Sequence, residues 1–300
     1  MKTFLGNVMD RMHITFFRRL ERLFLPDTFH AVIQPYYLAR AALNNIFKRT
    51  SPAPPMPDFL RTRRNFRARV GQRLHIYLNE VLEGFYDRLA EPRWLTRCEV
   101  TGLEHLVEAR RAGRPVVLVY WHFGCYPLLP GWLRGGLKYP VVSFVGGLSF
   151  KRKNLARLHD QYFPLPELPT SIHPDQLREI VRFVRGTNLI YIAIDVPIGK
   201  QVSVPFCDGW NYQLSTGPIR MASHFGADLI SCGLTREGPW RYRLTFGRPV
   251  PRELLADEAD WPQAGKHLLE EMTPLFKTRP EQCGDAMAQR FIRRPDDGAK

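Results

Sequence analysis

The residues best suited to acid–base chemistry follow a continuous apolar run, Val116–Tyr120. This run is rich in β-branched residues, which predicts a buried strand of a parallel sheet. His122 and Gly124 come directly after it. Residues at the carboxyl ends of α/β strands line ligand crevices, where an imidazole can act as a general base. A histidine after a strand is often purely structural, so its position alone leaves both interpretations open.

A carboxylate follows a second apolar run. Asp195 comes directly after residues 189–194, which also predict a buried strand. Neighbouring strand ends can bring a carboxylate and an imidazole within hydrogen-bond reach. The carboxylate then orients the ring and offsets its developing positive charge. We therefore interpret His122 and Asp195 as a candidate pair.

Other motifs offer weaker candidates. His75 and Glu80 have the spacing His-x4-Glu, but they lie in a predicted helix, where five positions separate them by about 140° around the axis. Cys125 lies three positions after His122, next to the proposed site, but small buried cysteines are common in cores. Ser215 and Thr216 precede a predicted helix and are expected to cap it, and that helix end could in addition face a phosphate.

The chain shows no spacing typical of a bound metal or cofactor. It contains no P-loop, no dinucleotide-binding glycine motif and no Gly-x-Ser-x-Gly elbow. Its five cysteines are scattered, which favours a reducing compartment over a disulfide framework. We expect neither a metal nor a cofactor.

Strand and helix patterns alternate from about residue 98 onward. The predicted strands cover 116–120, 141–145, 189–194, 229–234 and 241–246. The predicted helices cover 104–111, 126–134, 150–162, 174–186, 217–225 and 263–278. This alternation predicts an α/β fold with a mixed, mostly parallel central sheet flanked by helices.

The N-terminal quarter carries most of the formal net charge of +14, because residues 1–73 hold 14 basic and four acidic side chains. Residues 4–47 mix arginine with aromatic and aliphatic residues, as an amphipathic helix in a membrane interface does. A helix pair packed on the protein's own core is equally compatible, and Pro35 is expected to kink or end a helix there. A proline linker at 51–57 divides the chain into a basic, membrane-associating segment (1–57) and a larger domain (58–300).

The partner of this basic segment is expected to be an anionic membrane surface. Six arginines lie between residues 61 and 73, but no nucleic-acid recognition motif accompanies them. We therefore expect no nucleic-acid partner. No run of about 18 apolar residues predicts a membrane span.

Several short motifs occur in a characteristic order along residues 85–295. They are Gly102–Leu106, Gly113–Leu118, His122–Gly124, Ala193–Gly199, Val202–Phe206, Ser215–Ala222, Arg241–Gly247, Arg279–Gln282 and Arg290–Phe291. Each is weak alone, but together the chain resembles the bacterial lipid A biosynthesis acyltransferases, the late lauroyl and myristoyl enzymes of the lysophospholipid acyltransferase group.

This resemblance implies a glycerol-3-phosphate acyltransferase-like fold and direct acyl transfer from an acyl carrier protein or coenzyme A thioester. The acceptor would be a hydroxyl or amine of a lipid or glycolipid, deprotonated by His122 with Asp195 as its partner. Backbone N–H groups near Gly124, or a nearby basic side chain, would stabilise the oxyanion. The expected location is the cytoplasmic face of the bacterial inner membrane. The resemblance assigns substrate binding to Phe123, Gly124, Thr216, Gly217 and Arg220.

One position departs from the family pattern. The family has an Asp or Glu five positions after the histidine, where this chain has Pro127. Proline cannot accept a hydrogen bond from the imidazole through a side chain, so Asp195 is expected to replace the missing acid. The alternative is a degenerate family member that binds lipid or acyl carrier protein without catalysis.

Overall fold

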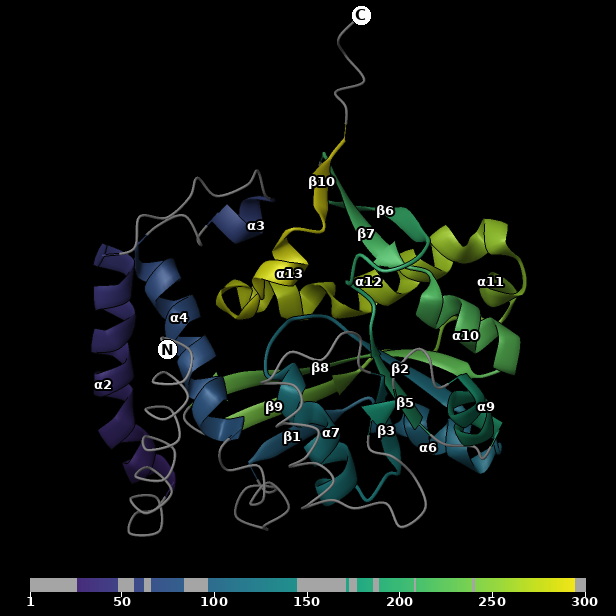
Figure 1. Cartoon of the computed structure of the whole chain (residues 1–300), viewed down its shortest axis with the longest axis horizontal. Coiled ribbons are helices and arrows are strands. Elements are labelled where there is room, and N and C mark those ends of the chain that lie inside the picture. The colour runs from purple at the N-terminus through teal and green to yellow at the C-terminus, as the bar shows by residue number, and fades with distance from the viewer. Residues whose placement is uncertain are drawn as a thin grey trace, which may run out of the picture.

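The computed structural model of the chain describes residues 26–47, 57–61, 66–83, 97–144, 171–172, 177–185, 189–207, 209–238 and 241–294. A central sheet lies between helical layers, and two N-terminal helices stand side by side at one end of it (Figure 1). The predicted helix at 150–162, residues 1–25 and most of the proline linker lie outside the described residues.

The central sheet has seven strands in the order β1-β9-β8-β2-β5-β3-β4. All neighbouring pairs are parallel except β8 and β9, which are antiparallel. The prediction of a mixed, mostly parallel sheet flanked by helices is therefore confirmed. The strands are β1 (Cys98–Thr101), β2 (Val116–Tyr120), β3 (Val141–Phe144), β4 (Ser171–Ile172), β5 (Leu189–Ala193), β8 (Asp228–Gly238) and β9 (Arg241–Phe246).

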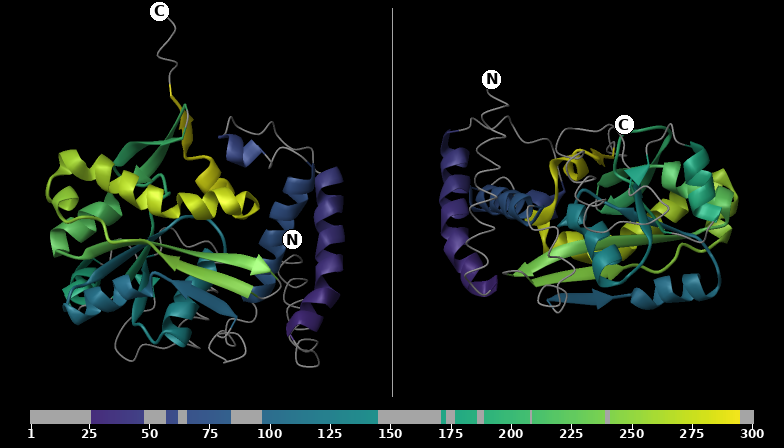
Figure 2. Two further views of the ribbon diagram at one scale, coloured as in Figure 1. Left: turned by 180° about the vertical axis from the view of Figure 1, so that it is seen from behind. Right: turned by 60° about the horizontal axis from the view of Figure 1, so that its bottom comes forward.

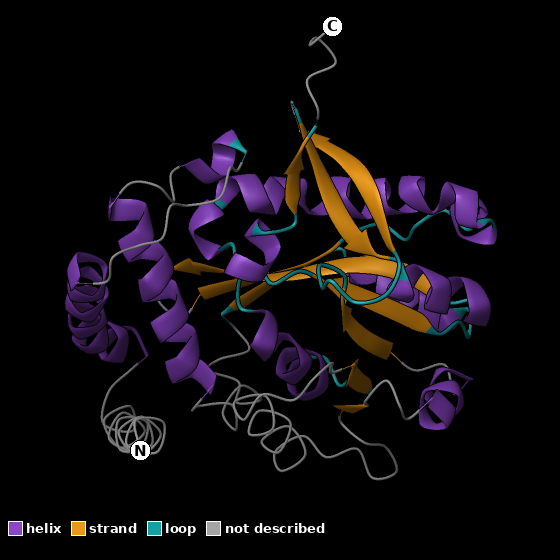
Figure 3. Cartoon of the chain, turned by 45° about the horizontal axis from the view of Figure 1, so that its top comes forward, coloured by secondary structure: helices purple, strands orange, loops and turns teal. Residues whose placement is uncertain are grey.

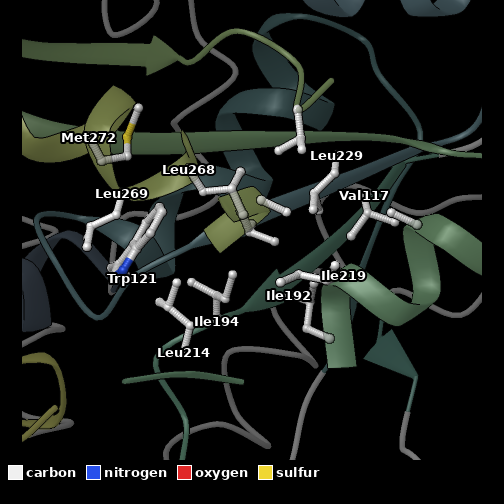
Figure 4. Packing of buried hydrophobic residues seen from close by; sticks show 14 of the residues in the cluster. Val117, Trp121, Ile192, Ile194, Leu214, Ile219, Leu229, Leu268, Leu269 and Met272 are labelled. Atoms are coloured by element: carbon white, nitrogen blue, oxygen red, sulfur yellow. The ribbon is translucent and has the colours of Figure 1, made fainter. Parts of the chain in front are cut away.

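The apolar strand runs are buried on both faces. Val117 and Val119 of β2 pack in one cluster with the helices on one side, while Val116 and Leu118 pack in a second cluster on the other. Figure 4 shows Val117 with Ile192, Leu229 and Leu268 in the first cluster. Because both faces of these strands are buried, successive positions of their sequences are apolar. The first cluster contains residues of α9 (Leu177–Arg185), α10 (Gly217–Phe225) and α12 (Trp261–Thr278). The second cluster contains residues of α6 (Leu103–Arg111) and α7 (Leu129–Gly131).

A second, antiparallel sheet rises from the main one on the side of α12 (Figure 3). Its strands are β6 (Gln201–Cys207), β7 (Trp210–Ser215) and β10 (Phe291–Arg293), in the order β10-β7-β6. Val204 and Leu214 pack on α12 beside Gly265, where a Cβ atom would lie 2.9 Å from Leu214 Cδ1. The end of β7 returns to the main sheet, because Ser215 N–H donates to the carbonyl of Ile194 (2.8 Å).

The N-terminal helices are α2 (Pro26–Phe47) and α4 (Phe66–Glu83), which pack side by side in both views of Figure 2. The short helix α3 (Asp58–Arg61) lies between them in sequence. Pro35 lies inside α2, so of the two expected outcomes, a kink or a helix end, the helix end does not occur. Ile33, Tyr37 and Ala41 are buried, and their burial offsets the stability lost because an internal proline removes one backbone hydrogen bond.

The two faces of α2 have different surroundings. Ile33 and Tyr37 belong to the same apolar cluster as strand β2, so this face packs on the protein's own core. Large apolar side chains of α2 on other positions are exposed: Tyr36, Leu38, Leu43 and Ile46. None of the described helices has the length and apolar character of a membrane span.

Candidate active site

The strand register brings His122 and Asp195 together. Tyr120 at the end of β2 pairs with Ala193 at the end of β5, and each candidate residue lies two positions further along its chain. His122 Nδ1 lies 2.7 Å from Asp195 Oδ1, and His122 N–H donates to Asp195 Oδ2 at 2.7 Å. The two candidate residues are therefore in direct contact, while the replacement of the family's acid by Asp195 stays a prediction.

The hydrogen bonds of Asp195 define which imidazole nitrogen can accept a proton. Asp195 is fully buried, and the His122 side chain is 9% exposed. A carboxylate can only accept hydrogen bonds, so Nδ1 carries the ring hydrogen and donates it to Asp195. Nε2 is left with a free lone pair. This is the arrangement that a general base requires.

The loop that carries His122 is held by a C-terminal segment. Gly284 N–H donates to the carbonyl of His122 (2.8 Å), and Gly124 N–H donates to the carbonyl of Gln282 (2.9 Å). Phe123 and Cys283 thereby form an antiparallel bridge. A Cβ atom at position 284 would lie 2.3 Å from the His122 carbonyl oxygen, so the approach requires glycine. Sequence reasoning matched Arg279–Gln282 to the family but missed this contribution to the site.

Four backbone N–H groups near Gly124, which were expected to include oxyanion donors, are bonded within the protein. The backbone N–H groups of Phe123, Gly124 and Cys125 donate to the carbonyls of Trp121, Gln282 and Leu234, respectively. The N–H of His122 donates to Asp195. Each of these four groups therefore already donates a hydrogen bond within the protein and is not available to an oxyanion. The other expectation, a nearby basic side chain, stays a prediction.

The other residues assigned to substrate binding have different surroundings. Phe123 is buried and its ring centroid lies 4.9 Å from that of Phe276 in the core. Thr216 is buried, and Gly217 is exposed at the start of α10. Arg220 is exposed, with its guanidinium carbon 5.8 Å from the ring centroid of Trp261. Their roles in substrate binding therefore stay predictions.

Capping of α10 differs from the expectation. Thr216 occupies the N-cap position, but its hydroxyl donates to the carbonyl of Lys200 (3.0 Å) and makes no capping bond. Ser215 Oγ instead accepts from the N–H of Gly217 at 3.4 Å. The loop at Lys200 competes successfully for the threonine hydroxyl because it lies against the end of β7.

Aromatic side chains surround the imidazole of His122. Its ring centroid lies 4.9 Å from that of Tyr126 and 6.0 Å from that of Tyr120, which stacks on Tyr191. Tyr126 also borders a narrow apolar pocket that leaves essentially no room for a water molecule. It is therefore far smaller than the cavities of typical ligand sites. Its other lining residues are Trp121, Phe123, Cys232, Gly233, Met272, Leu275 and Phe276.

Two residues near the loop are buried and neutral. Burial raises the pKa of the Cys125 thiol to about 12, which argues against a nucleophilic role. His75 of α4 is buried, and its Nε2 lies 3.2 Å from the carbonyl oxygen of Gly124. Burial, aided by the charge of Arg236, lowers the pKa of His75 to about 3. The sequence indicated that His75 and Glu80 are not a catalytic pair, but it did not reveal the contact with Gly124.

Acid should destabilise the protein through His75. Above pH 6.5, the ordinary pKa of histidine, His75 is neutral in both the folded and unfolded states. Between pH 6.5 and about 3, only the unfolded chain binds the proton, so the free energy of unfolding falls as pH falls. The loss at pH 5 is about 2 kcal/mol. Denaturant unfolding at about pH 7.5 and pH 5 measures it, and His75→Gln should have the smaller acid loss. An equal loss in both proteins would contradict this origin.

Comparison with known proteins assigns the chain to a family. Residues 83–282 match the family model described as bacterial lipid A biosynthesis acyltransferase. The crystal structure of the 1-acyl-sn-glycerophosphate (LPA) acyltransferase PlsC from Thermotoga maritima is similar, with a TM-score of 0.41 and 12% sequence identity. The alignment covers 87% of this chain and 100% of that chain. No curated protein matches the chain significantly. Because the family model spans more than half of the sequence, the chain belongs to the bacterial lipid A biosynthesis acyltransferase family and is an acyltransferase of lipid biosynthesis.

Proposed function

We propose that this protein transfers a fatty acyl group from an acyl carrier protein or coenzyme A thioester to a hydroxyl or amine of a lipid or glycolipid, with His122 as general base. The observation that carries this proposal is the contact of 2.7 Å between His122 Nδ1 and Asp195 Oδ1. It supports a catalytic role because it leaves Nε2 as a proton acceptor, even though Pro127 occupies the usual position of the acid.

The proposed reaction needs no covalent enzyme intermediate. Nε2 of His122 takes the proton of the acceptor hydroxyl or amine while that oxygen or nitrogen attacks the thioester carbonyl. The carbon–sulfur bond then breaks, and the imidazolium returns its proton to the leaving thiolate. Asp195 stabilises the imidazolium and holds its orientation throughout. The products are the acylated lipid and the free thiol of the carrier.

Association with an anionic membrane surface belongs to the same proposal. The exposed apolar residues of α2 and the excess of arginine in residues 1–73 support it. Each Lys or Arg near an anionic leaflet contributes about 1 kcal/mol to such binding. We place the protein at the cytoplasmic face of the bacterial inner membrane, where the acyl donor and a lipid acceptor meet.

Two observations favour a second function, binding without catalysis. Pro127 replaces the acid of the family motif, and the four N–H groups from His122 to Cys125 are bonded within the protein. A degenerate member would bind lipid or acyl carrier protein through the same surfaces. It would show no dependence of acyl transfer on His122.

Acyl transfer from radiolabelled donors distinguishes the two functions. Acyl carrier protein and coenzyme A thioesters would be tested against lysophospholipid, lipid A precursor and aminolipid acceptors in vesicles containing anionic lipid. We expect the wild-type protein to label at least one acceptor and His122→Ala to label none above background. Vesicle binding without transfer, across the whole panel, would favour the binding function. Equal transfer by both proteins would place the base elsewhere.

A further inference from the structure

We propose that His75 and Gln72 of α4 are positioning residues for the His122 loop, so that the N-terminal helices form part of the active-site scaffold. This inference rests on the proposed function, because it assigns these residues to the geometry of the proposed base. Figure 1 shows α4 beside the sheet, next to α2 and separate from the strands that carry His122 and Asp195.

One face of α4 contacts both chain segments that hold the catalytic loop. His75 Nε2 lies 3.2 Å from the carbonyl oxygen of Gly124. Gln72 Nε2 donates to the carbonyl of Cys283 (3.3 Å) and to Asp285 Oδ1 (3.2 Å). Residues three positions apart share one face of a helix. The helix therefore bonds the loop and its C-terminal partner at the same place.

The direction of the His75 hydrogen bond follows from its burial. His75 is 4% exposed, and its lowered pKa keeps it neutral at ordinary pH. A neutral imidazole has one N–H, and a carbonyl oxygen can only accept. The hydrogen therefore lies on Nε2, and His75 donates it to Gly124. The other neutral tautomer carries its hydrogen on Nδ1, so its Nε2 could not donate to the carbonyl of Gly124.

The His75 bond fixes a peptide that is already held at its other end. The carbonyl of Gly124 belongs to the same peptide plane as the N–H of Cys125, which donates to the carbonyl of Leu234 in β8 (2.6 Å). One end of the plane is bonded to the sheet and the other to α4. With both bonds in place the plane cannot rotate, and the backbone at His122, two residues earlier, keeps its direction.

Gln282 connects the C-terminal segment to the same strand. Its side chain accepts from the N–H of Arg236 (3.0 Å) and donates to the carbonyl of Arg236 (2.7 Å). Gln282 is buried, and its own carbonyl accepts from Gly124 N–H. The loop is thus fixed by β8, by the C-terminal segment and by α4. Of these three, α4 is the contribution that comes from the N-terminal part of the chain.

Loss of the His75 donor should impair the chemical step more than substrate binding. Misplacement of a catalytic group by about 1 Å can cost roughly 100-fold in rate. We therefore expect His75→Leu to lower kcat about 10- to 100-fold with little change in the KM for the acyl donor. His75→Gln keeps a donor at a similar distance from the backbone and should recover most of the kcat.

Hydrogen exchange provides a readout that general destabilisation would not reproduce. In His75→Leu, the N–H groups of Cys125 and Gly284 should exchange faster, while that of Leu118 in β2 should keep its protection. His224→Leu is the matched control, because His224 is an exposed histidine on α10. It should leave both kcat and the exchange of the loop unchanged.

The outcomes separate failure of this inference from failure of the proposed function. Activity in His122→Ala would overturn the proposed function and this inference with it. An inactive His122→Ala together with a fully active His75→Leu would overturn only the positioning role. A His75→Gln variant whose kcat is no higher than that of His75→Leu would also overturn only the positioning role. If His75→Leu does not fold, Gln72→Leu is the variant that tests the inference, and it should also lower kcat. Unchanged kcat together with unchanged hydrogen exchange of the loop would contradict the inference.

Discussion

Replacement of Asp195 by asparagine should reduce acyl transfer by about 10²- to 10⁴-fold while the protein stays folded. Asp195 accepts two hydrogen bonds from His122, one from the backbone N–H and one from Nδ1. An asparagine side chain has one acceptor oxygen and one donor nitrogen. If the asparagine oxygen still accepts the hydrogen bond from the His122 backbone N–H, the asparagine NH₂ group faces Nδ1 of the ring. The ring hydrogen must then move from Nδ1 to Nε2. The imidazole then has no lone pair for the substrate.

The kinetics of His122→Ala and the double variant test this explanation. Residues that act as a unit give losses that do not add. His122→Ala should therefore be as inactive as Asp195→Asn, and the double variant should lose little more. Pro127→Ala is the matched control, since Pro127 contributes no polar side chain to the dyad. It should stay close to wild-type activity. A fully active Asp195→Asn, measured at saturating donor, would exclude Asp195 as the partner of the base.

Replacement of Gly124 by alanine should destabilise the protein and lower its activity. Gly124 has a φ of +64°, where a Cβ atom costs about 1–2 kcal/mol. That Cβ would also lie 2.2 Å from the carbonyl oxygen of Leu234, a backbone atom of β8. Relief of such a contact requires backbone movement, which typically costs a further 1–3 kcal/mol, so we expect about 2–5 kcal/mol in total. Any shift of the loop also displaces His122.

Gly113 offers a matched control for the Gly124 experiment. Its φ is +65°, but a Cβ atom there would meet nothing within 4 Å. Gly113→Ala should therefore show the backbone strain alone, about 1–2 kcal/mol, with normal acyl transfer. Chemical denaturation of the two variants measures the difference. Equal losses of stability, or normal activity in Gly124→Ala, would show that the loop can move away from Leu234 without displacing the base.

The contact between His122 and Asp195 was predictable because each residue follows a strongly apolar strand. Parallel strands end at the same edge of a sheet, and β2 and β5 are neighbours in register. A local pattern thus placed both side chains at one edge. Helix α10 was predicted with its observed bounds for a similar reason, since its apolar spacing is local. Local pattern could not decide between a kink and a helix end at Pro35, where α2 continues because its packing outweighs the preference of the proline.

The support of the loop could not be read from local patterns. The bonds of Gly284 to His122, of Gln282 to Gly124 and of His75 to Gly124 join segments far apart in the chain. Glycine, glutamine and histidine at these positions carry no periodic signal. The bonding of the N–H groups of Gly124 and Cys125 was hidden for the same reason, because their acceptors, Gln282 and Leu234, lie on distant segments.

By itself, the sequence determined the family, the mostly parallel sheet and the two side chains of the proposed dyad. These properties follow from local apolar runs and from motif order, which are encoded in neighbouring residues. The tertiary structure alone decided that Asp195 faces Nδ1 and that the loop's own N–H groups are occupied. It also decided that an N-terminal helix bonds the loop. The orientation of a hydrogen bond depends on where two distant backbones meet, and packing of the whole chain sets that position.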